Sequence, residues 1–336
     1  MSLYAAETRR LVKRRFTRYF TLGAVVVLAA IAVAMFVTNH QIGPAQIAGA
    51  KAQAHADYQR NLDQAADFKK RCEAAKGTAD AQQYPSNCDE IGTPTEDDFD
   101  AQWYLPATFD FQKKFPDLVT TLAALLSVVG FVIGASFVGA EWSSGGMANL
   151  LLWRPQRLRV LGTKLLAFLV GLAGLTVLLS AAWTGIFTLV AKYRGTSASM
   201  TTGAWKSLAL TEARGLALVV VAGAVGFGLA SLGRHTAMAL GVAIGLVVVF
   251  QFGLGTALAL AKVKFAEAYL LPLWIVAWMK QKYDVQDYNA CNFSGTEGCR
   301  PDTFTITWHM AGAALAVAFV VIVGAALWTV RRRDIT

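Results

Sequence analysis

Residues 139–164 read GAEWSSGGMANLLLWRPQRLRVLGTK and separate two long apolar runs. The segment is too short and too apolar for an ordinary soluble domain, yet it combines one acid with paired glycines, a proline and four bases. A carboxylate at the C-terminal end of a helix opposes the helix dipole, so we predict that the chain breaks at Glu141. Ser143, Ser144 and the glycines would supply the break and the cap. A short interfacial segment is then expected at 149–153.

The runs on either side are long enough to cross a membrane. Of the 336 residues, 55% are apolar, and they gather in blocks of about 20, the length that crosses a hydrocarbon core of about 30 Å. The predicted fold class is therefore an all-α polytopic membrane protein with six transmembrane helices. These spans are expected at 20–38, 118–140, 162–190, 215–232, 236–260 and 309–330. Another run, at 269–279, is too short to cross, and we interpret it as an interfacial or re-entrant element.

The distribution of charge predicts the orientation of the spans. Bases concentrate before the first span, in the opening segment and after the last span, whereas the loop at 39–117 has 13 acids and 8 bases. By the positive-inside rule, both termini are expected in the cytoplasm. The remaining segments are then a cytoplasmic amphipathic helix (1–19), an extracytoplasmic loop domain (39–117), a cytoplasmic segment (141–161), outer loops (191–214 and 261–308), a cytoplasmic turn (233–235) and a cytoplasmic tail (331–336).

The N-terminal segment has the pattern of an amphipathic helix. At 100° per residue, Tyr4, Leu11 and Phe16 share one face. The basic face holds Arg9, Arg10, Lys13, Arg14 and Arg18. We expect this helix to lie in the membrane interface, held by apolar burial and by anionic headgroups. It is either a plain topology anchor or a lever that contacts a partner and joins the first span.

The four cysteines fall in the two predicted outer loops. Pairing within each loop, Cys72–Cys88 and Cys291–Cys299, closes the shortest loops, although four cysteines allow three pairings and unpaired thiols are the alternative. The spacing lacks C-x-x-C and no histidine is near, so no metal site is predicted.

The spans contain few polar groups. Because ionisable residues near the middle of the bilayer are almost absent from the sequence, a proton relay or ion pathway is disfavoured, and an amphipathic or lipid-like cargo fits better. Thr184 is expected to make an interhelical hydrogen bond, and two G-x-x-x-G patterns, 130–134 and 241–245, are typical of close helix packing. The net charge of +9 lies beside the spans without an aromatic–basic ribbon, so nucleic-acid binding is not expected.

The opening segment resembles the permeases of ABC-2 type transporters. The pattern is an acid after the second span, a glycine, a leucine run, a proline, an arginine and a lysine that opens the third span. In this chain these positions are Glu141, Gly145 or Gly146, Leu150–Leu152, Pro155, Arg157 and Lys164. The basic amphipathic start, the six spans and the tight turn at 226–234 are similar as well. The resemblance does not cover the 39–117 loop, which is larger than expected for the family.

The resemblance implies that the segment after Glu141 is a coupling helix that docks on an ATPase. The coupling residues would be Glu141, Gly145, Gly146, Leu150, Leu151, Arg154, Pro155 and Arg157. The sequence has no G-x-x-x-x-G-K-[ST] loop, so ATP and Mg²⁺ are expected on a separate chain and no cofactor on this one. The resemblance also implies two ATPase copies, a second permease subunit that is identical or related, contact with membrane lipids, alternating access, and a bacterial cell membrane.

Two other classes of function compete with a non-enzymatic exporter subunit. A sensory or scaffold protein would act through the large outer loop. An intramembrane enzyme is disfavoured because the four histidines are scattered without H-E-x-x-H, and residues 134–139 have the wrong spacing for a G-x-S-x-G elbow.

Overall fold

The computed structural model describes residues 3–153, 156–287 and 301–332. Within these residues, six helical runs are long and apolar enough to cross a membrane, as predicted. They are α2 (Arg15–Thr38), α4 (Phe111–Ser143), α6 (Arg157–Arg194), α7 (Thr202–Gly233), the run α8–η5–α9 (Thr236–Leu260) and α11 (Trp308–Arg332). Five of the six are longer than the apolar runs that predicted them, because the helical backbone continues into flanking polar residues.

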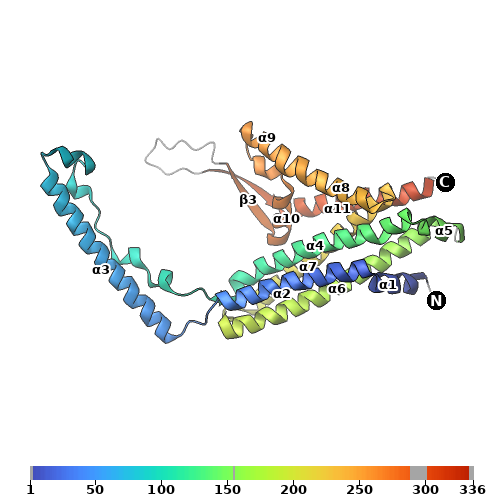
Figure 1. The fold of residues 1–336 in the computed structure, drawn as a ribbon, viewed down its shortest axis with the longest axis horizontal. Coiled ribbons are helices and arrows are strands. Elements are labelled where there is room, and N and C mark those ends of the chain that lie inside the picture. The colour runs from blue at the N-terminus through green and yellow to red at the C-terminus, as the bar shows by residue number, and fades with distance from the viewer. Residues whose placement is uncertain (1–2, 154–155, 288–300, 333–336) are drawn as a thin grey trace. The chain divides into compact units, whose positions relative to one another are not determined.

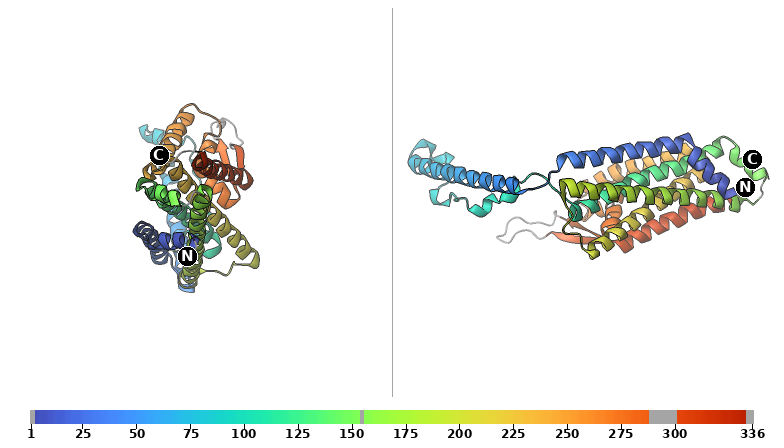
Figure 2. Two further views of the ribbon diagram at one scale, coloured as in Figure 1. Left: turned by 90° about the vertical axis from the view of Figure 1, so that its right-hand side faces the viewer. Right: turned by 90° about the horizontal axis from the view of Figure 1, so that it is seen from below.

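The first compact unit comprises residues 1–32, 112–187 and 200–336 and contains most of the helical bundle. Figures 1 and 2 show α2, α4, α6 and α7 running side by side. The short helices α1 (Leu3–Lys13) and α5 (Gly146–Trp153) lie at the same end of this bundle as the C-terminal end of α11. The start of α1 and the end of α11 thus lie at one end of the bundle, as an even number of spans requires.

Close packing among α4, α6 and α7 depends on small residues beside aromatic rings. Phe168 of α6 stacks between Phe137 of α4 and Phe227 of α7, with centroid distances of 6.0 and 6.2 Å. A Cβ on Gly134 would lie 2.5 Å from the Gly223 carbonyl oxygen, and one on Gly226 would lie 2.2 Å from that of Phe131. The predicted close packing at 130–134 is therefore confirmed, and it brings backbones together as small residues do in membranes.

The fifth span is built differently from the others. It consists of α8 (Thr236–Leu246), the π-helix η5 (Val247–Leu254) and α9 (Gly255–Leu260). Only 6% of the residues in its most apolar stretch are buried within the chain. A Cβ on Gly241 or Gly245 would meet no atom within 4 Å, so the close packing predicted at 241–245 is not made within the described residues.

Between the fifth and sixth spans lies a small helix–hairpin element. It contains η6 (Ala266–Tyr269), α10 (Leu271–Lys280) and the antiparallel strands β3 (Lys282–Asp287) and β4 (Asp302–Thr307), with Tyr283 opposite Ile306. The Trp278 indole donates a hydrogen bond of 2.9 Å to the Arg214 carbonyl, which fixes α10 against α7. The short apolar helix was expected and the hairpin was not. The predicted Cys291–Cys299 pair lies outside the described residues.

Residues 33–111 and 188–199 form the second compact unit. The long helix α3 (Pro44–Ala75) is followed by four 3₁₀ turns, η1 (Ala79–Gln83), η2 (Cys88–Glu90), η3 (Glu96–Phe99) and η4 (Ala101–Tyr104). The predicted Cys72–Cys88 disulfide is present and joins the end of α3 to η2. Two short strands, β1 (Phe109–Asp110) and β2 (Gly195–Thr196), pair in parallel.

Candidate functional site

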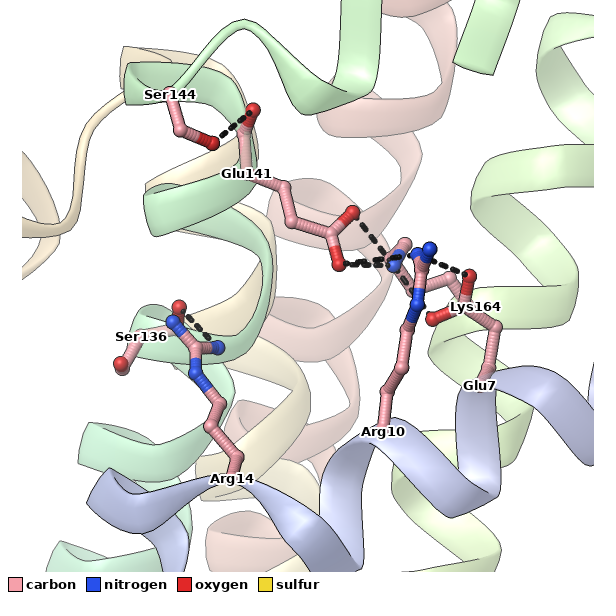
Figure 3. Close-up of polar contacts among 7 residues, drawn as sticks. All are labelled: Glu7, Arg10, Arg14, Ser136, Glu141, Ser144 and Lys164. Atoms are coloured by element: carbon pink, nitrogen blue, oxygen red, sulfur yellow. Dashed lines mark hydrogen bonds and ion pairs between the residues drawn. The ribbon is translucent and has the colours of Figure 1, made fainter.

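A buried ammonium group joins three separate segments of the chain. The Lys164 Nζ of α6 lies 2.6 Å from Glu7 Oε2 of α1 and 2.8 and 2.7 Å from the two carboxylate oxygens of Glu141 of α4. The Arg10 guanidinium lies 3.6 Å from Glu7 and 3.8 Å from Glu141. Figure 3 shows these four side chains converging between the three helices. We call them the charge cluster.

The charge cluster is balanced and mostly shielded from solvent. Its two carboxylates and two cations carry no net charge when all are ionised. The Lys164 side chain is 0% exposed, that of Glu7 2% and that of Glu141 22%. Breaking a buried ion pair leaves an uncompensated charge that costs about 3–5 kcal/mol, so the relative position of the three helices is tightly specified here. The cluster offers a mechanical link between them.

Local sequence explains how each member reaches the cluster. Glu7 and Leu11 are four residues apart in α1, so they lie on one face, and both are buried. Glu141 occupies the last turn of α4, and Lys164 lies two turns into α6. Lys164 also lies 4.8 Å from the centroid of the Phe137 ring, which ties the cluster to the aromatic stack.

The predicted break is present at the serines and glycines expected to supply it, a few residues after Glu141. The helix continues through Glu141 to Ser143, and Gly145 ends it with a φ of +74°, a left-handed conformation that glycine adopts without a Cβ penalty. The Gly145 amide donates to the Trp142 carbonyl at 3.2 Å. Lys164 compensates the unfavourable position of the Glu141 carboxylate at the end of the helix dipole, so no break is needed at that residue.

The structure describes most of the predicted coupling residues. Gly146 begins α5, Leu150 is half-buried within it, and Leu151 belongs to the same helix. Arg157 begins α6 and is half-buried. Arg154 and Pro155 lie outside the described residues. Met147 is 1% exposed, so α5 buries this side chain although most of the residues around it are exposed.

The predicted N-terminal helix is divided into two at Arg14. Helix α1 ends at Lys13 and α2 begins at Arg15, so Phe16 and Arg18 belong to the first span rather than to the interfacial helix. Arg9 and Lys13 are exposed on α1, as expected for its basic face.

Arg14 points into the protein, although the helical projection of the N-terminal segment placed it on the basic face. Its Nη1 donates a hydrogen bond of 2.8 Å to the Ser136 carbonyl of α4 (Figure 3). Burial lowers the pKa of the Arg14 guanidinium, and the nearby Glu141 carboxylate opposes that shift. Arg18 Nε donates to the Val12 carbonyl at the end of α1. These two bonds fix the corner between α1 and α2.

Glu7 was missed as a site residue by reasoning from the sequence. A signal was present, because Glu7 is the only acid before Asp57 and it stands in a strongly basic segment. Its partner Lys164 is 157 residues away, so no local pattern indicates the pair.

Comparison with known proteins gives one result. The family described as "ABC-2 family transporter protein" has a model that matches residues 1–335, nearly the whole chain and including the 39–117 loop. Neither a curated protein nor a solved structure matches the chain.

Proposed function

The chain belongs to the ABC-2 family of transporter proteins, and from that premise we propose that it is the permease subunit of an ATP-driven exporter. Membership of this family implies association with an ATP-binding-cassette ATPase, which would be a separate chain binding ATP and Mg²⁺. We further propose two such ATPases, a permease dimer, and a bacterial cell membrane with both termini in the cytoplasm. The placement of α1 and of the C-terminal end of α11 at one end of the bundle supports this topology.

The charge cluster is the observation that carries the proposed coupling mechanism. Helix α5 connects α4 to α6, and the Glu141–Lys164 ion pair joins the end of α4 directly to α6. A displacement of α5 by an ATPase would therefore move a closed unit rather than a loose loop. Because Lys164 also holds Glu7, the displacement would reach α1 and, through the Arg14 corner, the first span.

Alternating access would follow if this motion shifts the spans between two packings. We propose an amphipathic or lipid-like cargo, since the sequence of the spans has few ionisable residues near mid-bilayer. The Thr184 hydroxyl of α6 donates a 2.6 Å hydrogen bond to Glu212 Oε1 of α7. These two polar groups therefore satisfy each other rather than a cargo.

A site-specific crosslink tests the docking of α5. The exposed Asn149 of α5 is replaced by cysteine, and the matched control carries cysteine at the exposed Lys282 of β3. After affinity purification in mild detergent, mass spectrometry should find an ATPase in stoichiometric amount, crosslinked to Asn149→Cys and not to Lys282→Cys. Absence of an ATPase, or equal crosslinking from both positions, contradicts the proposal and directs attention to the disulfide-braced outer loop.

A further inference from the structure

A cavity of about 430 Å³ lies beside the charge cluster, between α1 and the spans. Its volume is within the usual range for small-molecule sites, about 300–1,000 Å³. The lining comes from four helices: Thr8, Leu11 and Val12 of α1; Thr17, Arg18, Thr21, Leu22 and Val25 of α2; Ile133 of α4; and Phe168, Gly171, Leu172 and Leu175 of α6. All of these residues belong to one compact unit.

The absence of a side chain at Gly171 lets α1 pack closely against α6 on one side of the cavity. A Cβ there would lie 2.8 Å from Leu11 Cδ2, so glycine lets the buried Leu11 of α1 close over α6. The cavity is therefore enclosed at the α1 end. Toward the spans, the exposed Leu22 and Val25 leave it open to the lipid phase.

The polarity of the lining changes along the cavity. At one end are the hydroxyls of Thr8 and Thr17 and the guanidinium of Arg18, and at the other are aliphatic residues such as Val25 and Leu175. Arg18 and Val25 are seven residues apart in α2, which is about 10 Å along a helix axis. This distance is most of the hydrocarbon depth of one leaflet, about 15 Å. The gradient thus runs from headgroup level into the bilayer.

The headgroup end of the cavity has two polar groups that a ligand could contact, the Thr17 hydroxyl and the Arg18 guanidinium. The Thr17 Oγ1 is buried and has no hydrogen-bond partner among the described residues. The Arg18 Nε bond to the Val12 carbonyl uses one of five guanidinium N–H donors and holds the group at the cavity. Arg18 is exposed, so its charge is accessible from the membrane surface.

We propose that this cavity binds one anionic phospholipid. Its phosphate is held by Arg18 and its acyl chain fills the apolar part between α2 and α6. Charge complementarity at Arg18 selects an anionic headgroup, and the lining of Leu22, Val25 and Leu175 matches an acyl chain. Because the lid of the cavity is α1, the lipid stabilises the position of α1 beside the charge cluster. This inference depends on neither the cargo nor an ATPase.

Native mass spectrometry of the full chain tests the site. The purified protein is delipidated and then given phosphatidylglycerol or phosphatidylcholine in separate titrations, and inorganic phosphate is added to the phosphatidylglycerol complex as a competitor. We expect one phosphatidylglycerol per chain to survive activation that removes phosphatidylcholine. Arg18→Gln should weaken this retention about fivefold, the effect of one surface base on binding to anionic lipid. Val25→Trp, which fills the acyl part, should abolish it.

Matched controls separate this site from ordinary lipid at the protein surface. Arg15→Gln removes a neighbouring exposed charge, and Val26→Trp adds the same ring at a residue that is 60% exposed and does not line the cavity. Both should retain the lipid. Equal loss in all four variants, or equal retention of the two lipids, would overturn the proposal. Displacement of the lipid by inorganic phosphate at equal concentration would also overturn it, because the site would then recognise a free anion.

Discussion

Lys164 Nζ lies 2.7 Å from Glu141 Oε2, so the last turn of α4 is fastened to the start of α6 on either side of α5. The two residues are 23 positions apart, and the intervening chain contains the predicted coupling residues that follow Glu141. This contact makes the connection between the second and third spans a closed structural unit. Its other partner, Glu7, brings α1 into the same unit.

Replacing Lys164 by methionine should strongly destabilise the chain. Two carboxylates, one of them 2% exposed, would lose their main counter-charge, at a cost of about 3–5 kcal/mol. Thermal unfolding in detergent should show a clear drop in Tm. The variant with Glu7→Gln and Glu141→Gln added should recover most of that loss, since the only charge of the cluster that remains is the solvent-exposed Arg10. If the triple variant is as unstable as Lys164→Met alone, the side chain matters for packing rather than charge.

Glu141→Ala should separate the movement of α5 from that of α1. In the complex with the ATPase, hydrogen exchange is compared with and without ATP. The wild type should respond to ATP in both α5 and α1, whereas the variant should respond in α5 alone. Arg10→Gln is the control, because this 61% exposed side chain lies at 3.6–3.8 Å from the carboxylates and adds little to the link. If ATP still changes the exchange of α1 in Glu141→Ala as much as in the wild type, the relay is refuted.

Alanine should be tolerated at one glycine of the spans and not at another. In Gly226→Ala the new Cβ would lie 2.2 Å from the Phe131 carbonyl oxygen, and α4 and α7 must separate. Overpacking of this kind costs about 1–3 kcal/mol. Gly241→Ala meets no atom within 4 Å and should keep or raise the Tm, because alanine favours helix. Equal Tm values would mean that the α4–α7 contact adjusts without strain.

The disulfide of the second unit should protect it from unfolding. Closing a loop of about 15 residues contributes roughly 3 kcal/mol in the chain-entropy model. The double variant Cys72→Ala/Cys88→Ala should be cleaved faster by protease within α3 than the oxidised wild type. Intact mass after thiol alkylation tests both predicted pairs. Wild type should accept label only after reduction, whereas labelling of Cys291 and Cys299 without reduction would contradict the second pair.

Acid should loosen the η3 turn. The Thr95 amide and hydroxyl donate to Asp98 Oδ2 at 2.8 and 2.9 Å, and these bonds lower the pKa of the Asp98 carboxyl. The resulting stabilisation is complete above the ordinary aspartate pKa of about 3.9 and is lost as pH falls through the lower folded value. The control variant Asp97→Asn keeps the bonds of Asp98, so its cleavage by pepsin near η3 should increase as the pH falls from about 3.9 through the lower folded pKa. Asp98→Asn removes the carboxylate, so it should already be cleaved readily at about pH 3.9.

Features that depend on residues close together in the sequence were predicted correctly. Six apolar runs predicted six spans, and the proximity of Cys72 and Cys88 predicted their bond. The expected interhelical bond of Thr184 is also present. The π-helix η5 was not predicted because its sequence is uniformly apolar, and periodicity then carries no information about the helix type.

Features set by distant residues were not predictable in the same way. Arg14 shares the basic face of the helical projection, yet it turns inward because a carbonyl of α4 lies within its reach. The helix continues past Glu141 because the compensating cation comes from the next span. In each case the missing information was which helices become neighbours.

The pairing of Glu7 with Lys164 also sets an order for biosynthesis. Helix α1 is synthesised before its buried partner, which is made 157 residues later. At a synthesis rate of about 5–20 residues per second, that interval is on the order of 10 s. During this time the Glu7 carboxylate must stay in water or at the headgroups, because no counter-charge from the third span exists yet. Helix α1 therefore reaches its final position only after the third span has been made, and nascent chains stalled before Lys164 should carry α1 undocked.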